Sequence, residues 1–203
     1  MSSRIARLFR EAADPFGVLA AEGYLYRFAG SALNTTATGA TSFATTTPTF
    51  LLSVAAGAQV AVIPAEMRLF QAGTVAGGAI TYLMEMDNAD RYTSGGTAMT
   101  AQNAKTDGLA LPSAVKAYST VGSAITATNA VGIRMDGALL GQDVSPAEGA
   151  VQTVSWEPKA GVDFLVPTAS AGASWLINTS AGSTGPTWFF SFKAAVVPLD
   201  WFS

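Results

Sequence analysis

Histidine and cysteine are both absent from this 203-residue chain. Their absence excludes disulfides, thiolate and imidazole metal ligands, and the Ser-His-Asp and Cys-His arrangements of nucleophilic catalysis. The fold must therefore be held together by burial and main-chain pairing, and only carboxylates remain for acid–base chemistry. We interpret the chain as a non-enzymatic protein that needs no cofactor.

Charge is also scarce. Only 12% of the residues are charged, against 49% hydrophobic, and the net charge is −3. So few basic residues argue against nucleic-acid binding over the whole surface, because neutralising phosphates needs many Lys and Arg. The composition favours a protein that hides much of its exterior in a symmetric assembly, since interface centres are depleted of charge. A stable secreted or surface β-protein is the alternative.

Long hydrophobic runs are missing as well. No uninterrupted apolar stretch approaches the roughly 20 residues of a membrane-spanning helix. The arginine-rich start, MSSRIARLFREAADPFG, is not followed by the apolar segment of a signal peptide. We therefore expect neither a cleaved signal nor a membrane anchor.

The densest apolar patterning lies in residues 50–88. Glycine and proline breaks cut this stretch into pieces too short for packed helices but typical of neighbouring antiparallel strands. Period-two alternation places Ile80, Tyr82 and Met84 on one face of such a strand. Proline cannot donate to a ladder, so Pro64 is expected to end a strand or to lie at an edge. The strands predicted here span 50–54, 59–63, 66–71 and 79–86.

The rest of the chain continues the same pattern without a helical period. Further strands are predicted at 23–29, 97–104, 114–121, 130–140, 151–157, 162–166, 174–178 and 187–197. Residues 30–49 predict a long loop or a β-rich edge, residues 91–96 a loop, and Asp136-Gly137 a tight hairpin. The predicted fold is an all-β antiparallel sandwich or jelly roll over residues 23–203, preceded by an arm of residues 1–22.

The arm contains the best helical candidate, residues 2–13, which an Asp-Pro pair at 14–15 should end. Its apolar residues share one face with Ile5, and its arginines recur at a spacing of three. This cationic, amphipathic segment either docks on an acidic partner or a neighbouring subunit, or is a short terminal helix with a solvated arginine face. The predicted partner-binding residues are Arg4, Arg7, Leu8, Phe9 and Arg10.

Carboxylates give the remaining enzyme hypothesis. Glu66 and Glu85 fall on strands predicted to be neighbours, and two facing acids are what a glycosidase needs, although solvated strand residues are commoner. Asp87 and Asp90 offer oxygen ligands for Ca²⁺, but turn formation explains them more simply, so no metal site is predicted. The other acidic candidates are Asp136, Asp143, Glu148, Glu157 and Asp163.

Three segments carry a family resemblance. The strand start Ile63–Met67, the Trp-Glu-Pro-Lys segment Trp156–Lys159, and Thr184–Thr187 before a terminal aromatic strand resemble jelly-roll virion structural proteins of tailed bacteriophages. The resemblance covers most of residues 20–203 and is to capsid decoration (cement) or head-fibre proteins. It implies a homotrimer made in the host cytoplasm and fixed to the capsid surface through the major capsid protein or other virion proteins.

Three functions follow from these observations. The first is a virion structural protein that bridges and stabilises capsid subunits without binding nucleic acid or membrane. The second is a carbohydrate- or receptor-binding β-module of a phage tail or head fibre, with Tyr92, Tyr118 or Trp188 as stacking platforms. The third is a carboxylate glycosidase.

Overall fold

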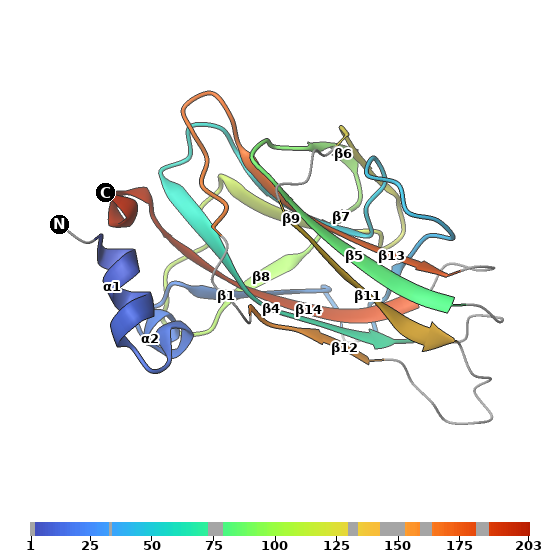
Figure 1. Cartoon of the computed structure of the whole chain (residues 1–203), viewed down its shortest axis with the longest axis horizontal. Coiled ribbons are helices and arrows are strands. Elements are labelled where there is room, and N and C mark those ends of the chain that lie inside the picture. Colours follow the sequence, from blue (N-terminus) through green and yellow to red (C-terminus); the bar gives the residue numbers. More distant parts are fainter. Residues whose placement is uncertain are drawn as a thin grey trace.

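Two antiparallel sheets of six strands each stack face to face, with two short helices at one end (Figure 1). This arrangement comes from a computed structural model, which describes residues 3–32, 34–72, 79–129, 134–142, 153–158, 164–181 and 187–203. The predicted all-β antiparallel sandwich with a short N-terminal helix is confirmed. Within the described ranges, no helix is long and apolar enough to cross a membrane.

The first sheet, sheet A, carries the N-terminal helices. Its strands run in the order β12-β4-β14-β1-β8, and β2 pairs with β14 beside this path. Every pairing in it is antiparallel. The strands of sheet A are β1 (Leu25–Ala29), β2 (Ala37–Thr38), β4 (Val60–Gln71), β8 (Thr100–Asn103), β12 (Thr153–Trp156) and β14 (Thr187–Pro198).

The second sheet, sheet B, has the order β11-β5-β13-β3-β9-β7. Its strands are β3 (Phe50–Val54), β5 (Ala79–Asp87), β7 (Thr97–Ala98), β9 (Val115–Ser119), β11 (Arg134–Gln142) and β13 (Ala173–Ala181). A separate pair, β6 (Tyr92–Gly95) and β10 (Ile125–Ala127), packs on its outer face. Successive strands alternate between the sheets, from β3 to β4 to β5 and from β12 to β13 to β14, as in a jelly roll.

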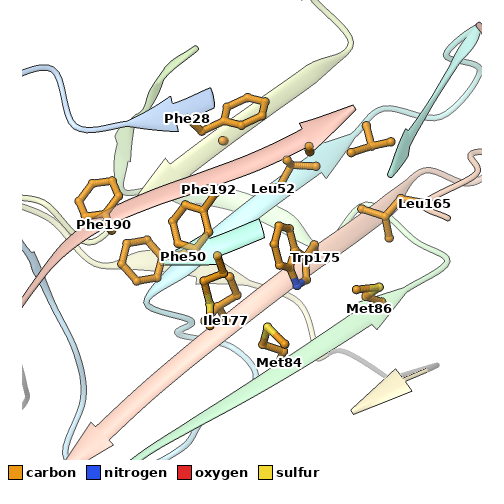
Figure 2. Close-up of a cluster of buried hydrophobic side chains, with 14 of the residues drawn as sticks. Phe28, Phe50, Leu52, Met84, Met86, Leu165, Trp175, Ile177, Phe190 and Phe192 are labelled. Carbon is orange, nitrogen blue, oxygen red and sulfur yellow. The ribbon is translucent and has the colours of Figure 1, made fainter. Parts of the chain in front are cut away.

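Aromatic side chains fill the space between the sheets (Figure 2). Phe50 of sheet B contacts Phe190 and Phe192 of sheet A, with ring centroids 4.9 and 4.8 Å apart. Trp175 meets Phe192 edge to face at 5.9 Å. Such rings bury large areas, so they supply much of the hydrophobic stabilisation of the sandwich. The expectation that Trp156 and Trp175 are core residues is confirmed.

Strand β4 is continuous, so the strand end expected at Pro64 is wrong, whereas the alternative, an edge position, fits, because among the described residues β12 pairs with β4 only at Met67–Phe70. The register between β4 and β14 shifts at this point: Lys193 lies opposite Glu66, whereas the next residue, Ala194, lies opposite Pro64. Ala65 is therefore the extra residue of a β-bulge. Bulges are among the few places where a strand accepts proline, because the ladder is locally interrupted there.

Other strand predictions need correction for the same kind of reason. Asp136-Gly137 does not form a hairpin, because β11 continues through it and pairs with β5 both before and after these two residues. The strand predicted at 97–104 divides at Met99, giving β7 in sheet B and β8 in sheet A. Part of the loop predicted at 91–96 is strand β6. Leu165 forms only an isolated bridge to Val62 instead of a strand.

Some predictions fall outside the described residues. These are the first residues of the strands expected at 130–140, 151–157 and 162–166, and the acids Asp143, Glu148 and Asp163. The hydroxyl-rich segment 30–49 is described apart from one position and is mostly loop, as predicted, with the short strand β2 inside it. Its end is fixed to sheet B, because Thr49 donates its N–H to Ile177 at 2.9 Å.

The N-terminal segment forms two helices, α1 (Arg4–Glu11) and α2 (Pro15–Ala21). The helix predicted within residues 2–13 is confirmed as α1, which ends at Glu11, just before the Asp14-Pro15 pair expected to end it. The same pair also begins α2, because the Asp14 side chain accepts the N–H of Gly17 at 2.8 Å and Pro15 occupies the first helical position.

Both helices cover one end of the outer face of sheet A, beside the C-terminal 3-10 helix η2 (Leu199–Phe202) (Figure 1). Ile5 of α1 and Leu19 of α2 are buried there. They share an apolar cluster with residues of β1, β4, β14 and η2, namely Leu25, Ala61, Ile63, Ala65, Ala195, Val197 and Trp201. Among the described residues, no helix covers the other end of the same face.

Candidate functional site

The predicted partner-binding residues divide into those that contact the sandwich and those that do not. Arg4 is bound on two sides: its Nη2 lies 2.9 Å from Glu22 Oε2, and its guanidinium carbon lies 3.6 Å from the centre of the Trp201 ring. A cation over an indole ring is attracted by its electron-rich face. Leu8 packs half-buried on the apolar cluster under the helices. These two residues therefore help to hold α1 in place.

Arg7 and Arg10 lie on the exposed side of α1. Arg10 pairs with Glu11 at 2.7 Å, but both side chains are more than 60% exposed, so the pair is weak. Arg7 forms no ion pair within the part of the chain that the structure describes. Two guanidinium groups are thus available to a partner at this end of the molecule.

An apolar patch adjoins these arginines. Phe9 of α1 meets Phe164 edge to face at 6.1 Å, and Phe164 in turn contacts Phe202 at 5.2 Å. Phe164 and Val166 point outward on either side of the buried Leu165, and 39% and 38% of their surfaces are exposed. We call Arg7, Arg10, Phe9, Phe164 and Val166 the α1 surface. Phe9 itself is half-buried and packs on the apolar cluster under the helices, so Phe164 is the exposed ring of this surface. Aromatic residues and arginine are enriched at protein-binding surfaces.

A second candidate site is the end of sheet A that the helices leave open. Residues opposite one another on neighbouring strands share a face, so the registers assemble this surface row by row. We call it the open half of sheet A. It comprises Glu66, Arg68 and Phe70 of β4, Phe189, Ser191 and Lys193 of β14, Arg27 and Ala29 of β1, and Thr100 and Gln102 of β8.

Ion pairs organise the part of the open half nearest the helices. Glu66 Oε1 lies 2.7 Å from Arg68 Nε, and Glu66 Oε2 lies 2.9 Å from Lys193 Nζ. Arg27 donates from Nε to Ser191 Oγ at 3.0 Å. Of these four charged side chains three are cations and one is a carboxylate, while Asp14 and Glu157 lie nearby, toward the helices.

A hollow of about 510 Å³ lies at the far end of the open half. Two phenylalanine rings form its apolar wall: Phe70 and Phe189 are direct cross-strand neighbours and are 42% and 39% exposed. Arg27 is the charged residue among those that line it. Its other lining residues include Gly30, Ser31, Ala32 and Thr35 from the loop after β1, together with Thr100, Gln102 and Ser191. None of these was singled out from the sequence, because their proximity depends on which strands pair.

The outer face of sheet B buries its polar groups instead of exposing them. Glu85 is 4% exposed and its Oε2 has no hydrogen-bond partner. Burial, and secondarily the nearby charge of Asp87, raises the pKa of Glu85 above its usual value. Asp87 is fully covered and accepts from Arg91 Nε and Nη2 at 3.0 and 3.1 Å.

This arrangement overturns the suggestion that Glu66 and Glu85 face one another. Strands β4 and β5 belong to different sheets, and the two carboxylates lie on opposite outer faces of the sandwich. Asp90 has a structural partner, because its Oδ1 accepts from Ser53 Oγ at 2.8 Å. No group of three or more acids suited to a metal ion occurs among the described residues.

The aromatic residues expected to serve as stacking platforms lie elsewhere. Trp188 is completely buried, so that role is wrong for it. Tyr92 and Tyr118 stack on each other with centroids 3.9 Å apart, which occupies one face of each ring. Burial is the largest cause that raises the pKa of Tyr118 to about 12, and the hydrogen bond with Tyr92 adds to it.

Comparisons with known proteins give only remote similarity. No family model and no curated protein matches the chain. Among solved structures, the chain is similar to the VP2 subviral particle of infectious bursal disease virus, with 11% identity and a TM-score of 0.20 over 86% of this chain and 41% of that one. The T13 viral particle of the same virus gives 11% identity and a TM-score of 0.19 over 86% and 39%.

The chain thus spans about two fifths of the length of the viral chains it matches. Scores of this size lie below those of proteins with a common fold. The architecture therefore follows from the strands and registers described above, and function from the surfaces of this chain.

Proposed function

We propose that this protein is a non-enzymatic structural component of a bacteriophage virion, a capsid decoration protein that bridges and stabilises capsid subunits as a homotrimer. The observation that carries the proposal is the α1 surface, where solvent-exposed Phe164 and Val166 adjoin Arg7 and Arg10. The low charge content and the resemblance to decoration proteins of tailed bacteriophages support it further.

The chemistry of the α1 surface indicates the kind of partner. The two exposed arginines would pair with carboxylates, and apolar side chains of the partner would cover Phe164 and Val166. We therefore expect an acidic surface with an apolar centre, on the major capsid protein or another virion protein. Three copies engaged together would bind strongly even if each contact were weak, because the second and third contacts form within one complex.

Point substitutions test this surface more cleanly than removal of the arm. Deleting residues 1–14 would also remove Ile5, which is buried in the cluster beneath the helices, so the truncated chain would expose apolar surface. A double charge reversal, Arg7→Glu with Arg10→Glu, leaves that cluster intact. The matched control is Lys105→Glu with Lys116→Glu, which changes the net charge equally on two exposed side chains elsewhere.

Each protein would be mixed with capsids that lack it and sedimented with them, and its own mass would be measured by analytical ultracentrifugation. The proposal expects a trimer, and about a tenfold or larger loss of capsid binding for the arginine double variant. The lysine control should bind as the unaltered chain does. A monomer at high concentration, or equal binding by both double variants, would refute the proposal.

A further inference from the structure

The hollow on the open half of sheet A lies apart from the α1 surface and has the lining of a sugar-binding site. We propose that it binds a short oligosaccharide that carries a carboxylate group. Phe70 and Phe189 form the stacking surface, and Arg27 holds the carboxylate. This binding function goes beyond the proposed bridging role, and it uses a different set of residues.

The size and polarity of the hollow fit this ligand class. Its volume of about 510 Å³ falls within the range of about 300 to 1,000 Å³ that small-molecule sites occupy. Sugars present many hydroxyl groups that both donate and accept, so their sites need mixed donors and acceptors. The hydroxyl and amide groups around this hollow meet that need; they belong to Ser31, Thr35, Thr100, Gln102 and Ser191.

The loop wall of the hollow is held in shape before any ligand arrives. Ala32 donates its N–H to Thr35 Oγ1 at 3.1 Å, and Thr35 donates its N–H to the Ala32 carbonyl at 3.1 Å. A Cβ at Gly30 would lie 2.5 Å from Thr35 Cβ, so glycine is what lets this wall lie so close to the strand. A preformed wall reduces the entropy that binding costs.

The two phenylalanines that form the apolar wall of the hollow are also its floor for a stacked ligand. Phe70 and Phe189 are directly opposite on antiparallel strands, which places their Cβ atoms about 5 Å apart, so their rings form one continuous surface. Both are about two fifths exposed, although aromatic rings gain most when they are covered. The C–H face of a sugar ring covers an aromatic ring without burying its own hydroxyls.

Arg27 decides the charge of the ligand. Its Nε is engaged by Ser191, which fixes the guanidinium and leaves the two terminal nitrogens for a planar bidentate partner. Within the described ranges no carboxylate pairs with Arg27, whereas Glu66 already serves Arg68 and Lys193.

The acidic groups near the open half lie toward the helices. Asp14 and Glu157 line a neighbouring hollow of about 440 Å³ together with Glu66. Their negative charge would repel an anion at that end. Arg27 starts in the same row as Lys193 and Glu66, but its side chain reaches Ser191 and lines the hollow, so the carboxylate of the ligand is expected there, on the side of the guanidinium that faces the phenylalanines.

The test is titration calorimetry of the whole chain with sialyllactose and with trigalacturonate, which carry the carboxylate on different sugars. Lactose and maltotriose are the uncharged counterparts. Three variants would be compared, namely Arg27→Gln, Phe189→Ala and the charge-matched control Lys116→Gln on β9 of sheet B. All three replace exposed side chains, and far-ultraviolet circular dichroism verifies that each variant is folded.

At least one acidic oligosaccharide should bind saturably and more tightly than its uncharged counterpart. Arg27→Gln should weaken that binding about tenfold or more, as loss of a charged hydrogen-bonding group does. Phe189→Ala should weaken it about threefold or more through the lost ring contact. Lys116→Gln should leave it unchanged.

Two results would overturn the proposal. The first is that neither acidic oligosaccharide binds saturably, even if a glutamate-rich peptide binds the hollow instead. The other is acidic-sugar binding that is unaffected by Arg27→Gln. Either result leaves the bridging function untouched, because that function is measured with capsids and with substitutions on α1.

Discussion

Replacing Glu85 with glutamine should stabilise the protein at neutral pH. Glu85 is 4% exposed on β5, between β11 and β13, and its Oε2 has no hydrogen-bond partner. Asp87 lies two residues further along the same face and adds a second negative charge. The glutamine amide has nearly the same shape but carries no charge, so the substitution removes the buried charge without opening a cavity.

The direction of the pH effect follows from the raised pKa of Glu85. The usual value is 4.5, and burial raises it in the folded state, so the folded protein binds this proton more tightly than the unfolded chain does. The stabilising contribution of the protonated form is complete below the pKa that Glu85 has in the unfolded chain. It is lost as the pH rises through the folded pKa, and the ionised group then destabilises the fold.

The size of the effect follows from the unpaired oxygen. A buried polar group without a partner costs about 1–3 kcal/mol, and more when it is charged. Glutamine removes the charge but keeps an uncharged polar atom in the place of Oε2, so part of that cost remains. We therefore expect Glu85→Gln to raise the free energy of unfolding by about 1–2 kcal/mol at pH 7. In a chain of this length, that corresponds to about 2–8 °C in melting temperature.

The assay is urea unfolding, followed by tryptophan fluorescence at one fixed protomer concentration, from about pH 4 to about pH 8. The difference between Glu85→Gln and the unaltered chain should be small at the acidic end and should grow with pH. Glu157→Gln, at an exposed position, is the control and should show no such growth. Equal pH slopes for Glu85→Gln and the unaltered chain would refute the reasoning.

Two further predictions concern the same end of sheet B. Gly172→Ala should lower the free energy of unfolding by about 2 kcal/mol, because a Cβ there would lie 2.2 Å from the Val54 carbonyl oxygen and 2.7 Å from Asp90 Cβ. Thermal denaturation checks this, and Gly122→Asn, at an open position with φ of +72°, should cost little. Asp87→Asn should lower the free energy of unfolding, measured by chemical denaturation, by about 3 kcal/mol, because it leaves the largely buried Arg91 without its carboxylate. Adding Arg91→Met should restore part of this loss. A double variant that is only as stable as Asp87→Asn would contradict the prediction.

Much of the fold could be predicted from the sequence because the alternation of apolar residues is a local signal. The alternation in β5 predicts one face with Ile80, Tyr82 and Met84, and in the structure Ile80 and Met84 belong to the core and Tyr82 packs against it. The bulge at Ala65 could not be predicted, since it is defined only by the register with β14, more than a hundred residues away. Helix α2 could have been found, because an Asp followed by Pro is a helix start as well as a stop.

The candidate sites are harder to predict from the sequence, for a related reason. Alternation within β4 already grouped Phe70 with Arg68 and Glu66, away from the core. Nothing local, however, indicates that Phe189 and Arg27 complete that surface, because the neighbours of β4 are chosen by long-range pairing. The sequence indicates the arginines of α1, but it does not indicate that Arg4 pairs with Glu22 and lies over the Trp201 ring.

The structure also changes what the low charge content implies. A weakly charged sandwich needs cover for its outer faces, and part of that cover comes from the chain itself. Strands β6 and β10 cover Leu51 and Leu176 on sheet B, and α1 and α2 cover one end of sheet A. Composition alone therefore does not require sister copies, and the case for assembly depends on exposed Phe164 and Val166 and on the arginines of the α1 surface.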